Sequence, residues 1–177
     1  MMYVVIGDFH IPDRAERIPA WIREWLESQK REIDGILCTG DLTEYAVLAY
    51  MNSVAPTLCV RGNMDHLPLK DFEILDVGGT RILVVHGHQV RPRGNKEQLY
   101  ALARAAGAEI LVHGHTHRYD VDVYRGVLMI NPGTATGAWG GSYAGGTESF
   151  AVLELDPLRV RVFADGKEVV VRAGTGR

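Results

Sequence analysis

Five short apolar runs of this sequence end in a glycine beside a side chain that can bind a metal ion or carry a proton. Such glycines permit a sharp turn or a close approach of the backbone to a ligand. The loops that follow these runs carry carboxylates, imidazoles and one amide, at Asp8, His10, Asp41, Asn63, His86, His88, His115 and His117. Oxygen and imidazole donors without a thiolate suit a reactive site for Mn²⁺, Fe, Co²⁺, Ni²⁺ or Zn²⁺ better than a structural zinc site.

The spacing of these residues indicates how they share metal ions. In an extended segment, alternate side chains point to one side. The sequence has two such pairs, Asp8-x-His10 and His115-x-His117. Each pair is expected to close on a single ion. A carboxylate shared by two ions ~3.5–4 Å apart is typical of hydrolytic two-metal sites, and Asp41 is the natural bridge.

Buried strands must position these side chains, because the runs before them are almost continuously apolar. The predicted strands are 3–6, 35–38, 57–60, 82–85 and 109–112. In an open α/β sheet, ligands bind beyond the carboxyl ends of the strands, so the five loops should meet in one crevice. His113 is expected to be a packed strand residue.

Helical patterns separate these runs. Ile18, Trp21, Ile22, Trp25 and Leu26 form one apolar stripe. A second helix should begin at Asn95, with Gln98 three residues on, and end at Gly107. A third is expected at about 43–52. After residue 119 short strands follow, at 121–124, 127–130, 150–155, 160–163 and 169–171. Two sheets packed face to face with helices outside are therefore predicted.

The order of the motifs resembles the calcineurin-like metallophosphoesterases. The motifs are Asp8-x-His10, Gly40-Asp41, Gly62-Asn63-x-Asp65, His86-Gly87-His88 and Gly114-His115-Thr116-His117. In length and in the later Asn131-Pro132-Gly133, the chain is most similar to the small single-domain phosphodiesterase branch, which includes the retromer subunit of this fold. The resemblance implies an α/β fold, a four-layer α/β/β/α sandwich of two mixed sheets flanked by helices.

The resemblance also implies two divalent metal ions and a role for each motif residue. Asp8, His10 and His117 would bind the first ion. Asn63, His86 and His115 would bind the second, and Asp41 would bridge the two. Manganese is the expected metal, with nickel, zinc, iron or cobalt as alternatives. The implied reaction is hydrolysis of a phosphoester, preferably a phosphodiester, by in-line attack of a metal-bridging hydroxide. Asp41, Asn63 and His88 are the candidate catalytic residues.

One position departs from the family pattern. Many members carry a histidine after the motif asparagine that can protonate the leaving group, whereas this chain has Met64. Methionine has no proton to donate, so we expect a bias toward aryl esters. His66 or His88 could replace the missing histidine. Without an imidazole at position 64, Asp65 is expected to stabilise its loop through backbone hydrogen bonds.

Candidate substrate contacts flank the motifs. Arg91 and Arg93 could clamp a phosphodiester, or they belong to a solvated loop that leads into a helix. His88 could bond to a phosphoryl oxygen, or it is a histidine of the loop behind the site. In the glycine-rich loop 135–147, Trp139 and Tyr143 could stack on a nucleobase, pack back on the body or lie in a homo-oligomer interface.

Length and charge limit the class of protein. The 177 residues suit a single domain, residues 1–177, with a sizeable core. A net charge of −3 is unlike a protein held mainly by nucleic-acid phosphates, so a small phosphoester substrate is expected. Cys38 and Cys59 lie in apolar runs and are expected to be reduced core residues. We find neither a basic leader nor a spanning segment, which predicts a cytoplasmic location without a membrane partner.

The alternative function is a catalytically weak metal-binding scaffold, or protein-interaction module, of the retromer-subunit type. This alternative stays open because a shared fold does not by itself show that a protein is an enzyme. All seven ligand positions hold competent ligands, which favours an enzyme.

Overall fold

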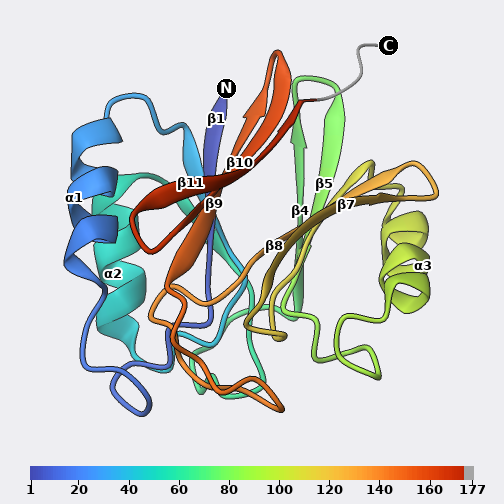
Figure 1. Cartoon of the computed structure of the whole chain (residues 1–177). Coiled ribbons are helices and arrows are strands. Elements are labelled where there is room, and N and C mark those ends of the chain that lie inside the picture. The colour runs from blue at the N-terminus through green and yellow to red at the C-terminus, as the bar shows by residue number, and fades with distance from the viewer. Residues whose placement is uncertain (174–177) are drawn as a thin grey trace.

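The strands of this chain form two mixed β-sheets (Figure 1). The computed structural model describes residues 1–173, so residues 174–177 of the expected domain lie outside the described part. The first sheet contains, in spatial order, β11 (Lys167–Ala173), β10 (Leu158–Ala164), β9 (Ser149–Leu155), β1 (Met2–Ile6), β2 (Gly35–Cys38) and β3 (Thr57–Cys59). The second contains β4 (Phe72–Val77), β5 (Thr80–Val85), β6 (Ile110–Val112), β8 (Val127–Pro132) and β7 (Tyr119–Tyr124).

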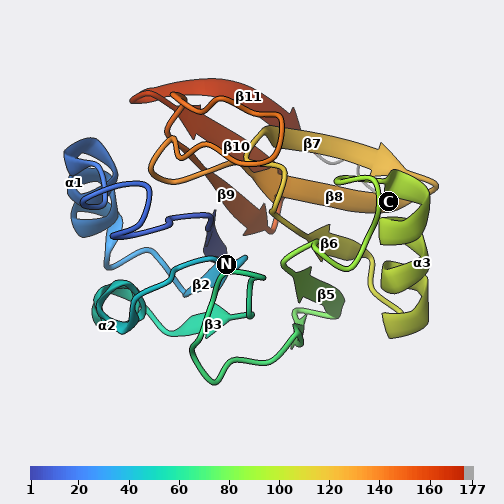
Figure 2. The same ribbon diagram turned by 90° about the horizontal axis from the view of Figure 1, so that it is seen from below.

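Helices cover the outer faces of both sheets (Figures 1 and 2). Helices α1 (Ala20–Gln29) and α2 (Tyr45–Val54) pack on the first sheet, and α3 (Lys96–Ala106) packs on the second. Between the sheets lies a core of fully buried aliphatic side chains, which includes Val5, Val84, Val112, Ile130 and Leu153. The predicted four-layer α/β/β/α sandwich is therefore confirmed.

Local signals explain where two of the helices begin and end. In α3, Asn95 Oδ1 accepts a hydrogen bond from the backbone N–H of Gln98 at 3.0 Å, and Gly107 ends the helix with φ 66°. In α1, Ile22 and Leu26 are buried as predicted, but the helix begins at Ala20 although the stripe starts at Ile18. Pro19 accounts for the difference, because a residue before proline is disfavoured in helical conformation.

Strand β4 was not among the predicted elements. It pairs antiparallel with β5 at the edge of the second sheet. Phe72 is 56% exposed and Ile74 is 38% exposed, so this strand lacks the continuous apolar character of the buried strands. Its sequence signals are alternation and the Gly78-Gly79 turn, which is typical of a hairpin.

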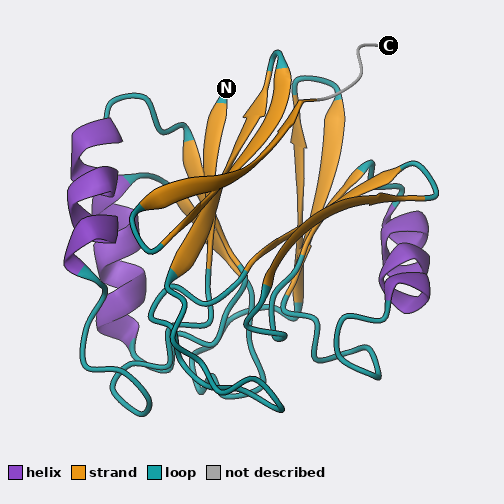
Figure 3. Cartoon of the chain, in the orientation of Figure 1, coloured by secondary structure: helices purple, strands orange, loops and turns teal. Residues whose placement is uncertain are grey.

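The loops that carry the motif residues gather at one end of the sandwich (Figure 3). Strands β1, β2 and β3 run parallel to one another, as do β5, β6 and β8. Their carboxyl ends lie at this same end, as the parallel arrangement predicts. Cys38 and Cys59 are free and buried, as expected. No helix in residues 1–173 is long and apolar enough to cross a membrane.

Candidate metal centre

Two clusters of buried ligand atoms lie at this end of the sandwich. The first contains Asp8, His10 and His117, and the second contains Asp41, His86 and His115. Within each cluster, the potential ligand atoms lie within 4.8 Å of one another. Residues from loops far apart in the sequence are therefore brought together in two sets of three.

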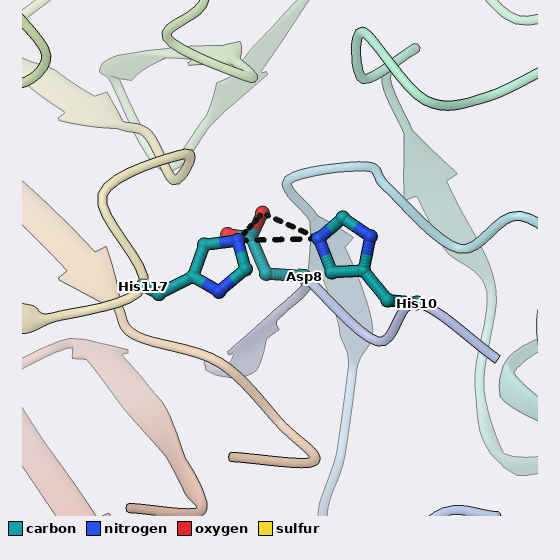
Figure 4. Close-up of side chains that lie close together, drawn as sticks. All are labelled: Asp8, His10 and His117. Atoms are coloured by element: carbon teal, nitrogen blue, oxygen red, sulfur yellow. Dashed lines mark hydrogen bonds and ion pairs between the residues drawn. The ribbon is translucent and has the colours of Figure 1, made fainter. Parts of the chain in front are cut away.

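The first cluster points its donor atoms at a common centre (Figure 4). His10 Nε2 and His117 Nε2 are 3.1 Å apart, and Asp8 Oδ1 is 3.4 Å from His117 Nε2. Asp8 Oδ1 is buried and makes no hydrogen bond within the described residues. A buried, unpaired carboxylate oxygen beside two imidazole nitrogens fits a divalent cation, since buried polar atoms are otherwise almost always paired.

The second cluster has the same character. His86 Nε2 lies 3.2 Å from Asp41 Oδ2 and 3.1 Å from His115 Nδ1. Asn63 Oδ1 also lies 3.1 Å from His86 Nε2, so the amide predicted for this site reaches it. Asn63 itself is exposed, which leaves this side of the cluster open to solvent.

Asp41 stands between the clusters. Its Oδ2 atom is 3.2 Å from His86 Nε2 and 3.5 Å from His10 Nε2. Its other oxygen accepts a hydrogen bond from the backbone N–H of Met64 at 2.8 Å. One carboxylate oxygen thus faces donors of both clusters, which is the arrangement that a bridging ligand requires.

Backbone carbonyls orient two of the imidazoles. His86 Nδ1 donates to the carbonyl oxygen of Thr39, and His117 Nδ1 donates to that of Ala138, both at 2.7 Å. These bonds leave the Nε2 lone pair of each neutral ring free for a metal. The sequence alone does not mark Thr39 and Ala138, because any residue type can supply a carbonyl oxygen.

The backbone at the motif residues is left-handed rather than extended. The φ angles are positive at Asp8 (52°), His10 (50°), Asp41 (52°), His115 (70°) and His117 (63°). Such values are uncommon outside glycine and cluster at functional sites, where the surrounding structure holds them. The prediction that each pair closes on one ion from an extended segment is therefore wrong for His115 and His117, which fall in different clusters.

Asp65 ties the loops of the second cluster together. Its Oδ2 accepts hydrogen bonds from the backbone N–H groups of Asp41 and Gly62, each at 2.8 Å. Its Oδ1 accepts one from the N–H of Thr43 at 2.9 Å. Asp65 therefore stabilises its loop and the loop of Asp41 through backbone hydrogen bonds, as its sequence context predicted.

The remaining candidate residues lie at different distances from the clusters. The His88 ring centroid is 5.5 Å from that of His86, and His88 Nδ1 makes no hydrogen bond within the described residues. His66 is exposed, and Met64 is 37% exposed. Of the two histidines that could replace the missing one, His88 is the one beside the clusters.

The two arginines differ in their placement. Arg93 donates from Nη1 to the carbonyl oxygen of His115 at 3.0 Å. Both arginines are exposed, and Arg91 bonds through its backbone N–H and carbonyl to the side chain of Gln98. His113 is buried, as predicted, but it lies one residue after β6 rather than within the strand.

Charge in the clusters is balanced through His86. Burial opposes its protonation, but the contact with Asp41 and the negative charge of Asp8 raise the pKa of His86 to about 9. Burial is the main cause that lowers the pKa of His10 and of His115 to about 4. Burial works against ionisation of Asp41, yet contact with His86 holds the pKa of that carboxyl below its ordinary value. Without a metal, the positive charge of protonated His86 therefore balances the negative charges of Asp8 and Asp41.

Metal loading should therefore depend on pH. A metal must displace the proton of His86, so Mn²⁺ should raise the melting temperature more near pH 9 than near pH 6.5. In the metal-free protein the raised pKa of His86 stabilises the fold below pH 6.5, and this contribution is lost as the pH rises through about 9. Thermal unfolding with and without Mn²⁺ across this range measures both effects. A metal-induced shift that does not grow with pH would contradict the assignment.

With this geometry established, comparison with known proteins identifies the family. Residues 1–157 match the family model of the calcineurin-like phosphoesterase superfamily domain. This chain belongs to that superfamily. A protein of Methanocaldococcus jannaschii named a probable metallophosphoesterase is 36% identical over 136 residues, which cover 77% of this chain and 69% of the relative. The resemblance seen in the motifs is confirmed.

Solved structures agree with the superfamily assignment. A single mutant of Vps29 from Entamoeba histolytica superposes with a TM-score of 0.88 at 32% identity, covering 99% of this chain and 100% of that one. Wild-type Vps29 of the same organism, complexed with Zn²⁺, gives 0.85 at 32% identity, covering 98% and 97%. An archaeal phosphodiesterase gives 0.69 at 18% identity, covering 93% and 99%, and shares the fold. This phosphoesterase domain therefore carries a candidate dinuclear metal centre.

Proposed function

We propose that this protein is a dinuclear-metal phosphodiesterase whose single domain acts on small phosphodiesters. The position of Asp41 carries the proposal, because its Oδ2 faces His10 of one cluster and His86 of the other. Two bound cations would lower the pKa of a water molecule toward ~7 and neutralise charge that develops on the phosphoryl oxygens.

The residues of the chain divide the work. Asp8, His10 and His117 would hold one ion, and Asn63, His86 and His115 would hold the other. Asp41 would bind both. The backbone carbonyl oxygens of Thr39 and Ala138 keep His86 and His117 in the tautomer whose Nε2 can bind a metal. His88 is placed to bond to a phosphoryl oxygen or to the leaving group.

The proposal names manganese as the metal and the cytoplasm as the location. Oxygen donors beside imidazoles suit Mn²⁺, although Ni²⁺, Zn²⁺, Fe and Co²⁺ accept the same ligands. Two free, buried cysteines support a reducing compartment. A diester is preferred to a monoester, because a monoanionic substrate needs fewer fixed cations than a dianionic one.

A reconstitution experiment tests the function. Metal-free protein is loaded separately with Mn²⁺, Ni²⁺ and Zn²⁺ and assayed on an aryl phosphodiester and on the matching monoester. We expect metal-dependent hydrolysis that is faster for the diester. No turnover of either ester by protein that has bound metal would refute the proposal.

A second candidate is a metal-binding protein-interaction module. The likeness to Vps29, a vacuolar protein sorting protein, favours it. The two functions are separated by the same assay, because a module of this kind would bind Zn²⁺ or Mn²⁺ without turning over either ester.

Met64 should set the leaving-group preference. We expect wild-type protein to hydrolyse aryl diesters much faster than alkyl diesters, because methionine cannot protonate an alkoxide. Met64→His should raise the alkyl rate by roughly 10²-fold, the lower end of general acid catalysis. Steady-state kinetics on paired aryl and alkyl diesters measure the change, with Met64→Leu as the control. Equal wild-type rates on both diesters would eliminate the idea.

Arg93 should contribute to substrate binding. Its guanidinium is anchored by the carbonyl oxygen of His115, and its remaining donors are available to a phosphodiester. Arg93→Ala should raise KM about tenfold, the value of one charge-assisted hydrogen bond. Arg91→Ala removes the same charge from an exposed neighbour and serves as the matched variant. An unchanged KM in Arg93→Ala would remove Arg93 from the binding site.

A further inference from the structure

A polar cavity of about 310 Å³ adjoins the metal centre. Its lining comes from the loop before α3 and the start of that helix, from the segment around the ligands His115 and His117, from β7 and β8, and from the glycine-rich loop. Its lining residues include Arg93, Lys96, Thr116, Arg118, Asn131 and Tyr143. The volume is near the lower limit for ligand pockets, so a compact group fits it better than a polymer.

The cavity lies beside the turn that carries His115 and His117. Thr116, in its lining, lies between His115 and His117 in the sequence. Gly140, also in the lining, lies so close to His117 that a Cβ at this position would be 2.6 Å from His117 Cε1. A substrate whose phosphodiester sits at the clusters would therefore extend one of its two ester arms into this cavity.

The floor of the cavity is held by hydrogen bonds. Asn131 Nδ2 donates to Thr116 Oγ1 at 2.9 Å, and Asn131 Oδ1 accepts from the backbone N–H of Gly133 at 2.9 Å. Thr116 Oγ1 also accepts from the backbone N–H of Arg118 at 3.2 Å. These bonds fix the polar surface before any ligand arrives.

Two cations of the lining are available to an anion. Lys96 is engaged, because its Nζ lies 2.6 Å from Asp122 and 3.3 Å from Asp120, which is the acidic residue of the lining. Arg93 and Arg118, by contrast, form no ion pair with any residue in the range 1–173. The Arg118 guanidinium lies 5.4 Å from the ring centroid of Tyr143, a contact that restrains it at the cavity wall.

We propose that this cavity binds a second phosphoryl group, so the preferred substrates are small phosphodiesters that carry one, such as nucleotides with an additional phosphate. The proposal rests on the proposed phosphodiesterase function. Guanidinium groups bind phosphate through paired, charge-assisted hydrogen bonds, and Arg93 and Arg118 both line the cavity.

Two esters with the same scissile bond test the proposal. These are thymidine 5′-(p-nitrophenyl phosphate) and its 3′-phosphorylated derivative. We expect Mn²⁺-loaded wild-type protein to have a kcat/KM about tenfold higher for the derivative, the value of one added charge-assisted contact. In Arg118→Ala the ratio should fall to near unity. Arg104→Ala, which removes the same charge from the last turn of α3, should keep the wild-type ratio.

A binding measurement separates this proposal from the function on which it rests. Calorimetric titration compares thymidine 3′,5′-bisphosphate with thymidine 5′-monophosphate. We expect the bisphosphate to bind about tenfold more tightly to the wild type, and this advantage to disappear in Arg118→Ala. Equal affinity of the wild type for the two nucleotides would overturn the cavity assignment alone. Absence of hydrolysis of both esters would overturn the proposed function.

Discussion

Replacing Asp41 by asparagine should abolish metal-dependent phosphodiester hydrolysis, with a loss of at least about 10³-fold in kcat/KM, or about 4 kcal/mol of transition-state stabilisation. Asp41 Oδ2 lies 3.5 Å from His10 Nε2 and 3.2 Å from His86 Nε2, closer to both imidazoles than Asp8 Oδ1 is. The amide has nearly the same shape but lacks the charge and one of the two oxygens. The variant should also retain fewer metal ions per chain, which elemental analysis of the loaded protein measures.

The matched control for this prediction is Asp76→Asn. Asp76 lies on β4, is exposed and pairs with Arg81 at the surface. Its replacement should leave both turnover and metal content unchanged. The prediction fails if folded Asp41→Asn retains more than about a tenth of wild-type activity, since the bridging role would then contribute less than about 1.4 kcal/mol.

Asp65→Asn should cause the largest loss of stability. Asp65 is buried and accepts three backbone hydrogen bonds, from Asp41, Gly62 and Thr43. An asparagine side chain turns one acceptor into a donor, so at least one N–H loses its partner. Bonds to a charged group contribute about 1.5–3 kcal/mol each, so we expect a loss of about 2–4 kcal/mol in the free energy of unfolding.

Activity should fall with stability in this variant, because Asp65 fixes the loops that carry Asp41 and Asn63. Urea denaturation and the diester assay measure the two losses. The control is Asp71→Asn, which breaks an exposed ion pair with Arg61 and should cost no more than about 1 kcal/mol. A free energy of unfolding for Asp65→Asn within about 0.5 kcal/mol of the wild type would contradict this account of the loop.

Sequence patterns predicted the sandwich because its signals are local. Buried apolar runs place β1, β2 and β5, and Asn95 with Gly107 delimits α3. Strand β4 was not predicted, because its residues alternate between exposed and half-buried and so form no continuous apolar run. The apolar stripe begins at Ile18, but Pro19 delays the start of α1 to Ala20.

The site was predictable in residue type but not in conformation. Glycine beside Asp8, Asp41, Asn63, His86 and His115 placed the loops with the seven candidate ligands at the ends of strands. The left-handed backbone at Asp8, His10 and Asp41 was not predictable, because tertiary contacts impose it against local preference. Any residue type can supply the carbonyl oxygens of Thr39 and Ala138, and the cavity around Arg118 depends on segments that are far apart in the sequence.

Anomalous diffraction from crystals grown with saturating Mn²⁺ tests the central claim most directly. We predict two manganese peaks about 3.5–4 Å apart, the spacing of hydrolytic two-metal sites. One should lie among Asp8, His10 and His117, the other among Asn63, His86 and His115, and Asp41 should touch both. A single peak, or two peaks with Asp41 bound to only one, would contradict the bridged centre on which the proposed function depends.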